Sequence, residues 1–143
     1  MPLIDVFFDA DAIIAGSASK TGAASILLQL AEFKLINGIT CKKVLEECRR
    51  NISKKLPGAM GAFDKIISNS ITIIENASRE DCRRYEGMAD DKDLIILTSA
   101  INFEIKYFVT FNVKHFYPTP DVDISIVKPS ELIHIIRKQL SDF

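Results

Sequence analysis

The sequence is poor in cysteine, and its cysteines are not arranged in pairs. Its 143 residues include three cysteines, Cys41, Cys48 and Cys82, and no C-x-x-C spacing occurs. A disulfide framework or a zinc knuckle needs an even set or closely spaced pairs, so the pattern disfavours both. We interpret the three residues as buried or incidental thiols in a reducing compartment.

An excess of charge of one sign is also lacking. The chain has 18 basic and 19 acidic side chains, which give a formal net charge of −1. This balance excludes a broad electrostatic attraction to nucleic acid, so nucleic-acid binding would need a local basic patch. No glycine-rich phosphate loop of either common pattern is present, which disfavours nucleotide binding.

Long apolar runs are absent as well. No stretch approaches the length of a membrane span, and residues 1–5 lack the pattern of a secretory signal. We therefore expect a soluble, cytoplasmic protein that does not contact membranes. Hydrophobic residues make up 48% of the chain, and its length fits one compact domain over residues 1–143.

What the chain does contain is a series of short apolar strands that alternate with helical segments. Strands are predicted at residues 3–8, 38–41, 70–74, 107–110 and 124–127. Helices are predicted at residues 9–15, 21–35, 42–52, 59–67, 79–88, 91–103 and 129–140, the first of them closed by Gly16 and Ser17. This alternation predicts an α/β fold, a three-layer α/β/α sandwich with a short-stranded, mainly parallel central sheet.

Carboxylates and other polar side chains are predicted to gather beyond the carboxyl ends of the strands, where parallel sheets bind their ligands. They are Asp9 and Asp11 after the first strand, Glu46 and Glu47 after the second, Asp90, Asp91 and Asp93 at the start of the helix before the fourth, and Thr110 and Asn112 after the fourth. Several carboxylates at one rim repel each other unless a cation neutralises them. Oxygen ligands with few imidazoles favour Mg²⁺ or Mn²⁺ over zinc.

Each acidic residue also has a purely structural interpretation. Asp9 or Asp11 can cap the helix that follows, and residues 90–93 can supply a cap and a favourable charge at another helix N-terminus. Glu46 can form a salt bridge with Arg50, four residues later on the same helix. The conjunction of acids at one rim is better evidence for a site than any one of them.

The residues resemble the PIN-domain family from about residue 3 to residue 116. VFFDADAII is similar to the family's opening, KKVLEECRRNI to its second motif and KDLIILTSAINFEIKYFVTFNVKHF to its most specific stretch. By position, the resemblance implies Asp9, Glu47 and Asp93 as metal ligands, with Asn112 at a fourth ligand position. Thr110 matches the hydroxyl position two residues before. The chain departs from the family pattern at Asp11, where many members carry Asn, and in the pair Asp90 and Asp91, which offers other choices for the third acid. Asn112 falls where the family often has Asp, or Asn in many toxin-like members.

The resemblance implies a Mg²⁺- or Mn²⁺-dependent ribonuclease that hydrolyses phosphodiester bonds of single-stranded RNA. Many small stand-alone members are toxins held inactive by an antitoxin, and many dimerise. A protein antitoxin and a homodimer are therefore expected partners. The alternative is a catalytically weak or inactive PIN-fold module that binds RNA or a protein. A receiver-like or phosphatase-like α/β domain is disfavoured because no convincing phosphoacceptor Asp and later strand-end Lys are found.

Basic and aromatic residues near the motifs leave the RNA contacts open. Arg49 and Arg50 follow the second motif, where they can meet phosphates or form a solvated face. His115 is interpreted as a hydrogen-bonded structural histidine rather than a catalytic base. Three aromatic residues are predicted to belong to the core rather than to a base-stacking platform: Phe108, Phe111 and Phe116.

Overall fold

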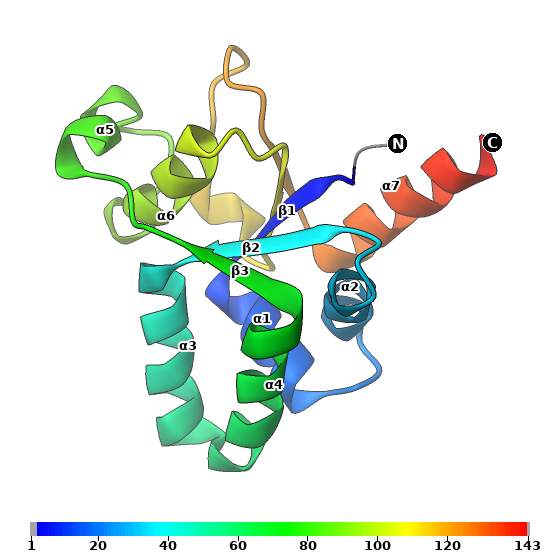
Figure 1. Ribbon diagram of the computed structural model, residues 1–143. Coiled ribbons are helices and arrows are strands. Elements are labelled where there is room, and N and C mark those ends of the chain that lie inside the picture. The colour runs from blue at the N-terminus through cyan, green and yellow to red at the C-terminus, as the bar shows by residue number, and fades with distance from the viewer. Residues whose placement is uncertain (1–2, 143) are drawn as a thin grey trace.

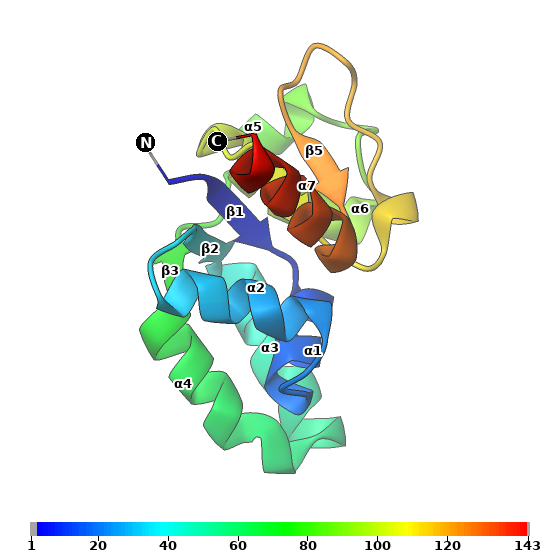
Figure 2. The same ribbon diagram turned by 90° about the vertical axis from the view of Figure 1, so that its right-hand side faces the viewer.

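A sheet of five parallel strands forms the centre of the computed structural model, which describes residues 3–142. The strands are β1 (Asp5–Phe8), β2 (Asn37–Cys41), β3 (Ile71–Ile74), β4 (Tyr107–Val109) and β5 (Ser125–Val127), in the order β3-β2-β1-β4-β5. Phe7 of β1 lies opposite Ile39 of β2 and Phe108 of β4, and the arrows of β1 and β5 point the same way in Figure 2. Met1, Pro2 and Phe143, which the expected domain of residues 1–143 includes, lie outside the described residues.

Helices cover both faces of this sheet. They are α1 (Ala10–Ala18), α2 (Ala23–Glu32), α3 (Lys42–Lys55), α4 (Met60–Ser70), α5 (Arg79–Arg84), α6 (Asp91–Asn102) and α7 (Pro129–Ser141), with short 3₁₀ turns η1 (Pro57–Ala59) and η2 (Val113–His115). In Figure 1, α1, α3 and α4 lie below β2 and β3, whereas α5 and α6 lie above them. The predicted three-layer α/β/α sandwich is confirmed. Within residues 3–142, no helix combines the length and the apolar character needed to cross a membrane.

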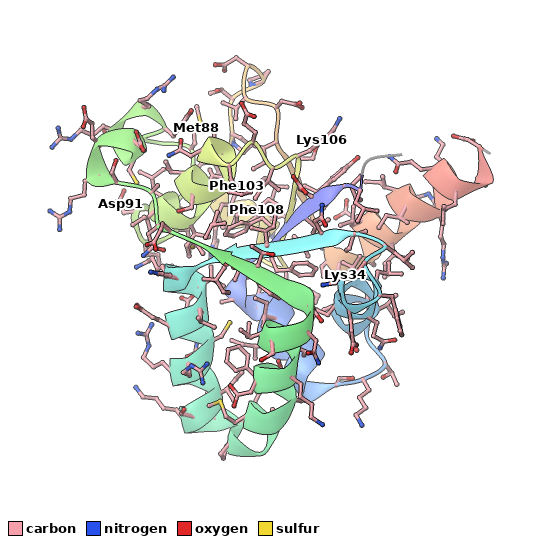
Figure 3. All side chains as sticks on the ribbon, viewed as in Figure 1. Lys34, Met88, Asp91, Phe103, Lys106 and Phe108 are labelled. Atoms are coloured by element: carbon pink, nitrogen blue, oxygen red, sulfur yellow. The ribbon has the colours of Figure 1, made fainter. Side chains whose placement is uncertain are left out.

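The core is built around the aromatic residues of the two central strands. Val6, Phe7 and Phe8 of β1 are fully buried, as expected for a parallel strand covered on both faces. The rings of Phe7 and Phe108 stack with centroids 5.1 Å apart, and Phe116 packs on Phe108 at 4.7 Å. Figure 3 shows Phe108 in the interior of the molecule. The predicted burial of Phe108 and Phe116 is confirmed.

Helix α1 does not end where the sequence pattern predicts. Gly16 and Ser17 were expected to close it, but both lie inside the helix, which continues to Ala18. A Cβ atom at Gly16 would come within 2.4 Å of Leu28 Cδ1, so glycine permits the close packing of α1 on α2. The Ser17 hydroxyl donates to the Ile13 carbonyl at 2.8 Å, which satisfies it inside the helix.

The strand order reverses direction between β1 and β4. Starting from β1, the chain first adds β2 and β3 on one side and then crosses to add β4 and β5 on the other. Neighbouring strands at such a switch point leave a crevice at their carboxyl ends, where ligands bind in open α/β sheets. Asp9 and Thr110 are the residues that directly follow β1 and β4. The topology therefore brings residues 101 positions apart in sequence to the same place.

Candidate functional site

A cavity of about 190 Å³ opens at this switch point. Its walls come from the start of α1, the middle of α3, the first turn of α6 and the segment after β4. Ten residues line it: Asp9, Ala10, Asp11, Ile14, Glu47, Asn51, Lys92, Asp93, Asn112 and His115. Four of them carry carboxylates and one carries an ammonium group, so the cavity is strongly acidic when all are ionised.

Asp9 lies at the base of the cavity and is nearly inaccessible to solvent. It is the N-cap of α1, where its Oδ1 accepts a hydrogen bond from the Ala10 amide at 2.8 Å, and its Oδ2 accepts one from the Thr110 hydroxyl at 2.8 Å. Burial and the nearby Asp11 carboxylate raise the pKa of Asp9 to about 7, against the two hydrogen bonds. The capping role and the place in the cavity therefore coexist in one residue.

Asp11 is held by the turn that follows β4. Its Oδ2 accepts hydrogen bonds from the Phe111 amide and the Asn112 side-chain amide, each at 3.0 Å. Thr110 Oγ1 lies 3.2 Å from the same oxygen, but its single proton favours the shorter bond to Asp9. Burial raises the pKa of Asp11, and these donors oppose the rise. Asn112 thus presents its amide to a carboxylate rather than to the cavity alone.

Glu47 enters the cavity from α3, which begins directly after β2. The next residue, Cys48, is fully buried and its Sγ lies 3.7 Å from the Ala10 carbonyl oxygen, so α3 is packed on the first turn of α1. Burial raises the pKa of the Cys48 thiol, which keeps it protonated. Glu46, by contrast, is exposed and does not line the cavity. The structure therefore separates two adjacent acids that sequence alone barely distinguishes.

Asp93 enters from the first turn of α6. Its Oδ2 is closed off from solvent and accepts no hydrogen bond from any described residue, and His115 Nδ1 lies 3.5 Å away. Burial raises the pKa of Asp93, whereas Lys92 and His115 lower it. Asp91 is exposed and outside the cavity. Asp90 is turned to Tyr117, whose hydroxyl donates to it.

The cavity offers the kind of oxygen ligand that a hard divalent cation prefers, and among the described residues Asp90, Asp93 and His115 are the group of three whose ligand atoms lie within 4.8 Å of one another. Asp9, Asp11, Glu47 and Asp93 offer carboxylate oxygens, and the thiol of Cys48 is engaged elsewhere, so zinc-type sulfur ligation is not available. The orphaned Oδ2 of Asp93 and the raised pKa of Asp9 are both features that a bound cation would relieve.

The structure brings together the predicted residues Asp9, Glu47, Asp93 and Asn112 in one cavity, with Thr110 hydrogen-bonded to Asp9 beneath it. Sequence reasoning left Asn51 and Lys92 unassigned, although both line the cavity. The available signal for Asn51 was its position one helical turn after Glu47. For Lys92 the signal was its place beside Asp93.

Several secondary interpretations change. The prediction that Phe111 belongs to the core is wrong, because its side chain is 45% exposed next to the cavity. Glu46 and Arg50 form no ion pair within residues 3–142. Arg49 pairs instead with Asp64 at 3.1 Å, which leaves Arg50 as the candidate for phosphate contacts.

A wider hollow of about 600 Å³ lies away from the acids, between α2 and α4. It is lined mostly by small and apolar side chains, and its charged members are Lys20, Glu32 and Lys65. With a single carboxylate it offers no set of metal ligands. The acidic cavity at the switch point is therefore the candidate for catalysis.

Two comparisons with known proteins found a match. The family model of the PIN domain matches residues 5–114. The crystal structure of VapBC2 from Rickettsia felis bound to a DNA fragment from their promoter aligns with a TM-score of 0.64 and 18% identity, and covers 87% of this chain and 98% of that one. Comparison with curated protein sequences gave no match. Because the family model spans most of the chain, including all the cavity-lining acids, the chain belongs to the PIN-domain family.

Proposed function

We propose that this protein is a Mg²⁺- or Mn²⁺-dependent ribonuclease that hydrolyses phosphodiester bonds of single-stranded RNA, and that it is the toxin of a toxin–antitoxin pair. PIN domains are generally nucleases, which supports a hydrolase. The observation that carries the proposal is the cavity lined by four carboxylates, one from the N-cap of α1 and three from α1, α3 and α6; the N-cap carboxylate has a pKa of about 7. Such a cluster is costly in the empty protein and is suited to a cation.

Asp9, Asp11, Glu47 and Asp93 are the residues that would hold the metal. A bound divalent ion supplies an activated water at neutral pH and neutralises charge that develops on the phosphate. The protein keeps its oxygen ligands in fixed orientations through hydrogen bonds. The Thr110 hydroxyl donates to Asp9 at 2.8 Å. The Asn112 side-chain amide donates to Asp11 at 3.0 Å.

The remaining cavity residues suit an anionic substrate. Lys92 offers a positive charge at the rim, and the Asn51 amide can donate a neutral hydrogen bond to a phosphate oxygen. Phe111, whose backbone amide donates to Asp11, has an exposed ring that can stack on an unpaired base, which favours single-stranded RNA over a duplex. The Phe111 amide donates to Asp11 and the Asn112 amide N–H of the backbone donates to the Thr110 hydroxyl, so the turn that carries the ring is held at two consecutive residues.

A partner protein and a cytoplasmic location complete the proposal. The VapBC2 structure with the same fold is a complex, which supports the expectation of a protein antitoxin for this chain as well. A homodimer remains part of the proposal on the ground of the resemblance to small stand-alone PIN proteins. Copurification with the protein encoded next to this one, followed by mass measurement of the complex, tests both partners together.

The central experiment compares Glu47→Gln with Glu46→Gln. Both variants exchange one glutamate for its amide at adjacent positions of α3, but only Glu47 lines the cavity. With Mn²⁺ and a generic single-stranded RNA, Glu47→Gln is expected to lose at least about 100-fold in cleavage rate, since one oxygen ligand is weakened. Glu46→Gln should stay within about two-fold of the parent rate, because surface substitutions rarely disturb a distant site.

Two outcomes of this comparison would contradict the proposed nuclease activity. Equal rates in both variants would mean that the cleavage comes from a contaminant or from another site. Stabilisation by Mn²⁺ without cleavage of any RNA would favour the alternative, a catalytically weak PIN-fold module that binds RNA or a protein. Neutral Asn112 at the fourth ligand position is the observation that makes this alternative worth testing.

A further inference from the structure

The segment after η2 is paired with the residues that immediately precede α6. Ala89 and Phe116 form an isolated antiparallel bridge, in which the Asp90 amide donates to the His115 carbonyl at 3.1 Å and the Tyr117 amide donates to the Met88 carbonyl at 2.6 Å. We call residues 115–117 the positioning arm. Its central residue, Phe116, is buried against Phe108, so the arm is anchored in the core. Its position is thus fixed from both sides.

The two residues that flank Phe116 both reach carboxylates of the adjacent helix start. His115 Nδ1 lies 3.5 Å from Asp93 Oδ2 and 3.9 Å from Asp90 Oδ2. The Tyr117 hydroxyl donates a hydrogen bond to Asp90 Oδ1. His115 is the last residue of η2, and Phe116, whose backbone is extended, turns its ring into the core between the two polar side chains.

Asp93 needs such a partner more than the other acids of the cavity do. Asp9 and Asp11 each accept good hydrogen bonds from the protein, whereas Asp93 Oδ2 is buried and accepts none within residues 3–142. His115 Nδ1 is only a few tenths of an ångström beyond an ordinary hydrogen bond from that oxygen. The imidazole lines the same cavity as the Asp93 carboxylate.

We propose that His115 is a positioning residue that orients the Asp93 carboxylate for cation binding, while Tyr117 fixes the neighbouring Asp90 carboxylate through a hydrogen bond to its Oδ1. This inference rests on the proposed metal-dependent function. In metal sites, mutation of a residue that holds a metal ligand in place commonly lowers metal affinity or activity by about 10- to 100-fold. His115 affects cation binding only through Asp93, and its Nδ1 is the atom that faces the Asp93 carboxylate.

An alternative arrangement has to be distinguished from this one. One oxygen each of Asp90 and Asp93 and one nitrogen of His115 lie within 4.8 Å of one another, so the imidazole itself is within range of a shared cation. A ligand and a positioning residue differ in two measurable ways. Only a ligand couples its nitrogen directly to the electron spin of bound Mn²⁺, and only a positioning residue can be replaced by any side chain that presents an N–H at the same point.

The test measures Mn²⁺ affinity by electron paramagnetic resonance of the full chain, with His115→Ala, His115→Asn and His115→Gln. The Asn amide nitrogen sits near the place of Nδ1, whereas the Gln amide extends further and does not. We expect His115→Ala and His115→Gln to weaken Mn²⁺ binding by about 10- to 100-fold and His115→Asn to recover to within about three-fold. In His115→Ala and His115→Gln, the KM for RNA should stay unchanged while kcat falls at subsaturating Mn²⁺.

Other results overturn the inference in distinguishable ways. Unchanged Mn²⁺ affinity in His115→Ala would show that Asp93 is oriented without the imidazole. Loss of affinity in all three variants, together with direct ¹⁴N coupling in pulsed spectra of the parent protein, would make His115 a ligand. A parent protein that binds no Mn²⁺ at all would overturn the proposed function itself. If His115→Ala fails to fold, the matched Asn and Gln variants still decide between the outcomes.

Discussion

Replacing Asp9 by asparagine should stabilise the metal-free protein at neutral pH, although the residue is the proposed centre of the site. Burial and Asp11 raise the pKa of Asp9 from 3.8 to about 7. The folded chain therefore binds this proton more tightly than the unfolded chain does. The contribution to stability is fully present below a pH of about 4 and is lost as the pH rises through about 7.

The size of the effect follows from the shift. Three pH units at about 1.4 kcal/mol each give about 4 kcal/mol, a large part of the roughly 5–15 kcal/mol that holds a domain of this size together. In Asp9→Asn the amide imitates the protonated carboxyl, because its oxygen can still accept from the Ala10 amide and its nitrogen can donate to Thr110. The two proteins should therefore be equally stable in acid and diverge as the pH rises.

Urea unfolding in EDTA at several pH values between about 4.5 and 8 measures this divergence. Exposed Asp123 precedes β5, at the opposite end of the sheet, and its amide variant serves as the control for the loss of one charge. Adding Mn²⁺ should reverse the order at neutral pH, because only the parent protein keeps its carboxylate ligand. Stability curves for Asp9→Asn and the parent that stay parallel across the range would refute the reasoning.

Two further predictions concern the contacts with RNA. Arg50→Ala is expected to raise the KM for RNA by about three- to ten-fold and to reduce the dependence of KM on salt. Arg49→Ala should change mainly stability, because Arg49 is already paired with Asp64. Cleavage kinetics at two salt concentrations check both expectations. Phe111→Ala is expected to weaken binding of single-stranded RNA to the catalytically impaired Glu47→Gln protein by roughly 1–3 kcal/mol, measured by fluorescence anisotropy. Phe103→Ala removes an equally exposed ring at the end of α6 and should have no such effect.

The fold was predictable because each strand is short and apolar and each intervening segment has helical periodicity. All five strands and seven helices lie within a few residues of the predicted ranges. The error at Gly16 has a simple cause, since a glycine that permits helix packing looks, in one sequence, like a glycine that ends a helix. The two kinds of glycine differ here only in the contact with Leu28 of α2, and local sequence patterns do not show that Leu28 packs against α1.

The acids of the site were predictable in kind but not in detail. That Asp9 and Thr110 meet follows from the strand order, which the alternation of elements does not specify. The choice of Glu47 over Glu46 and of Asp93 over Asp91 depended on the family resemblance, and it stays a prediction; Glu47 and Asp93 line the cavity, whereas Glu46 and Asp91 do not. The exposure of Phe111 could not be predicted, because the turn after β4 is held by a hydrogen bond from the Phe111 amide to Asp11, a residue near the other end of the chain.

Asp11 and Asn112 form a pair in the cavity: the carboxylate stands where many PIN domains carry Asn, and the amide stands where they carry Asp or, in many toxin-like members, Asn. The amide of Asn112 donates to the Asp11 carboxylate at 3.0 Å, so a carboxylate and an amide are both present, with the carboxylate on α1 instead of after β4. Restoring an acid with Asn112→Asp would set two carboxylates against each other. We expect this variant to be less stable than the parent by roughly 1–3 kcal/mol in EDTA at neutral pH.

The double variant Asp11→Asn with Asn112→Asp should recover most of that loss, since it keeps one carboxylate and one amide in contact. A double-mutant cycle of urea unfolding measures the coupling, which should be at least about 1 kcal/mol for a pair in direct contact. Additive effects would mean that the two side chains do not depend on each other. Coupling in stability, together with Mn²⁺ affinity close to that of the parent, would show that the charge of the fourth ligand has changed position between two neighbouring residues without leaving the site.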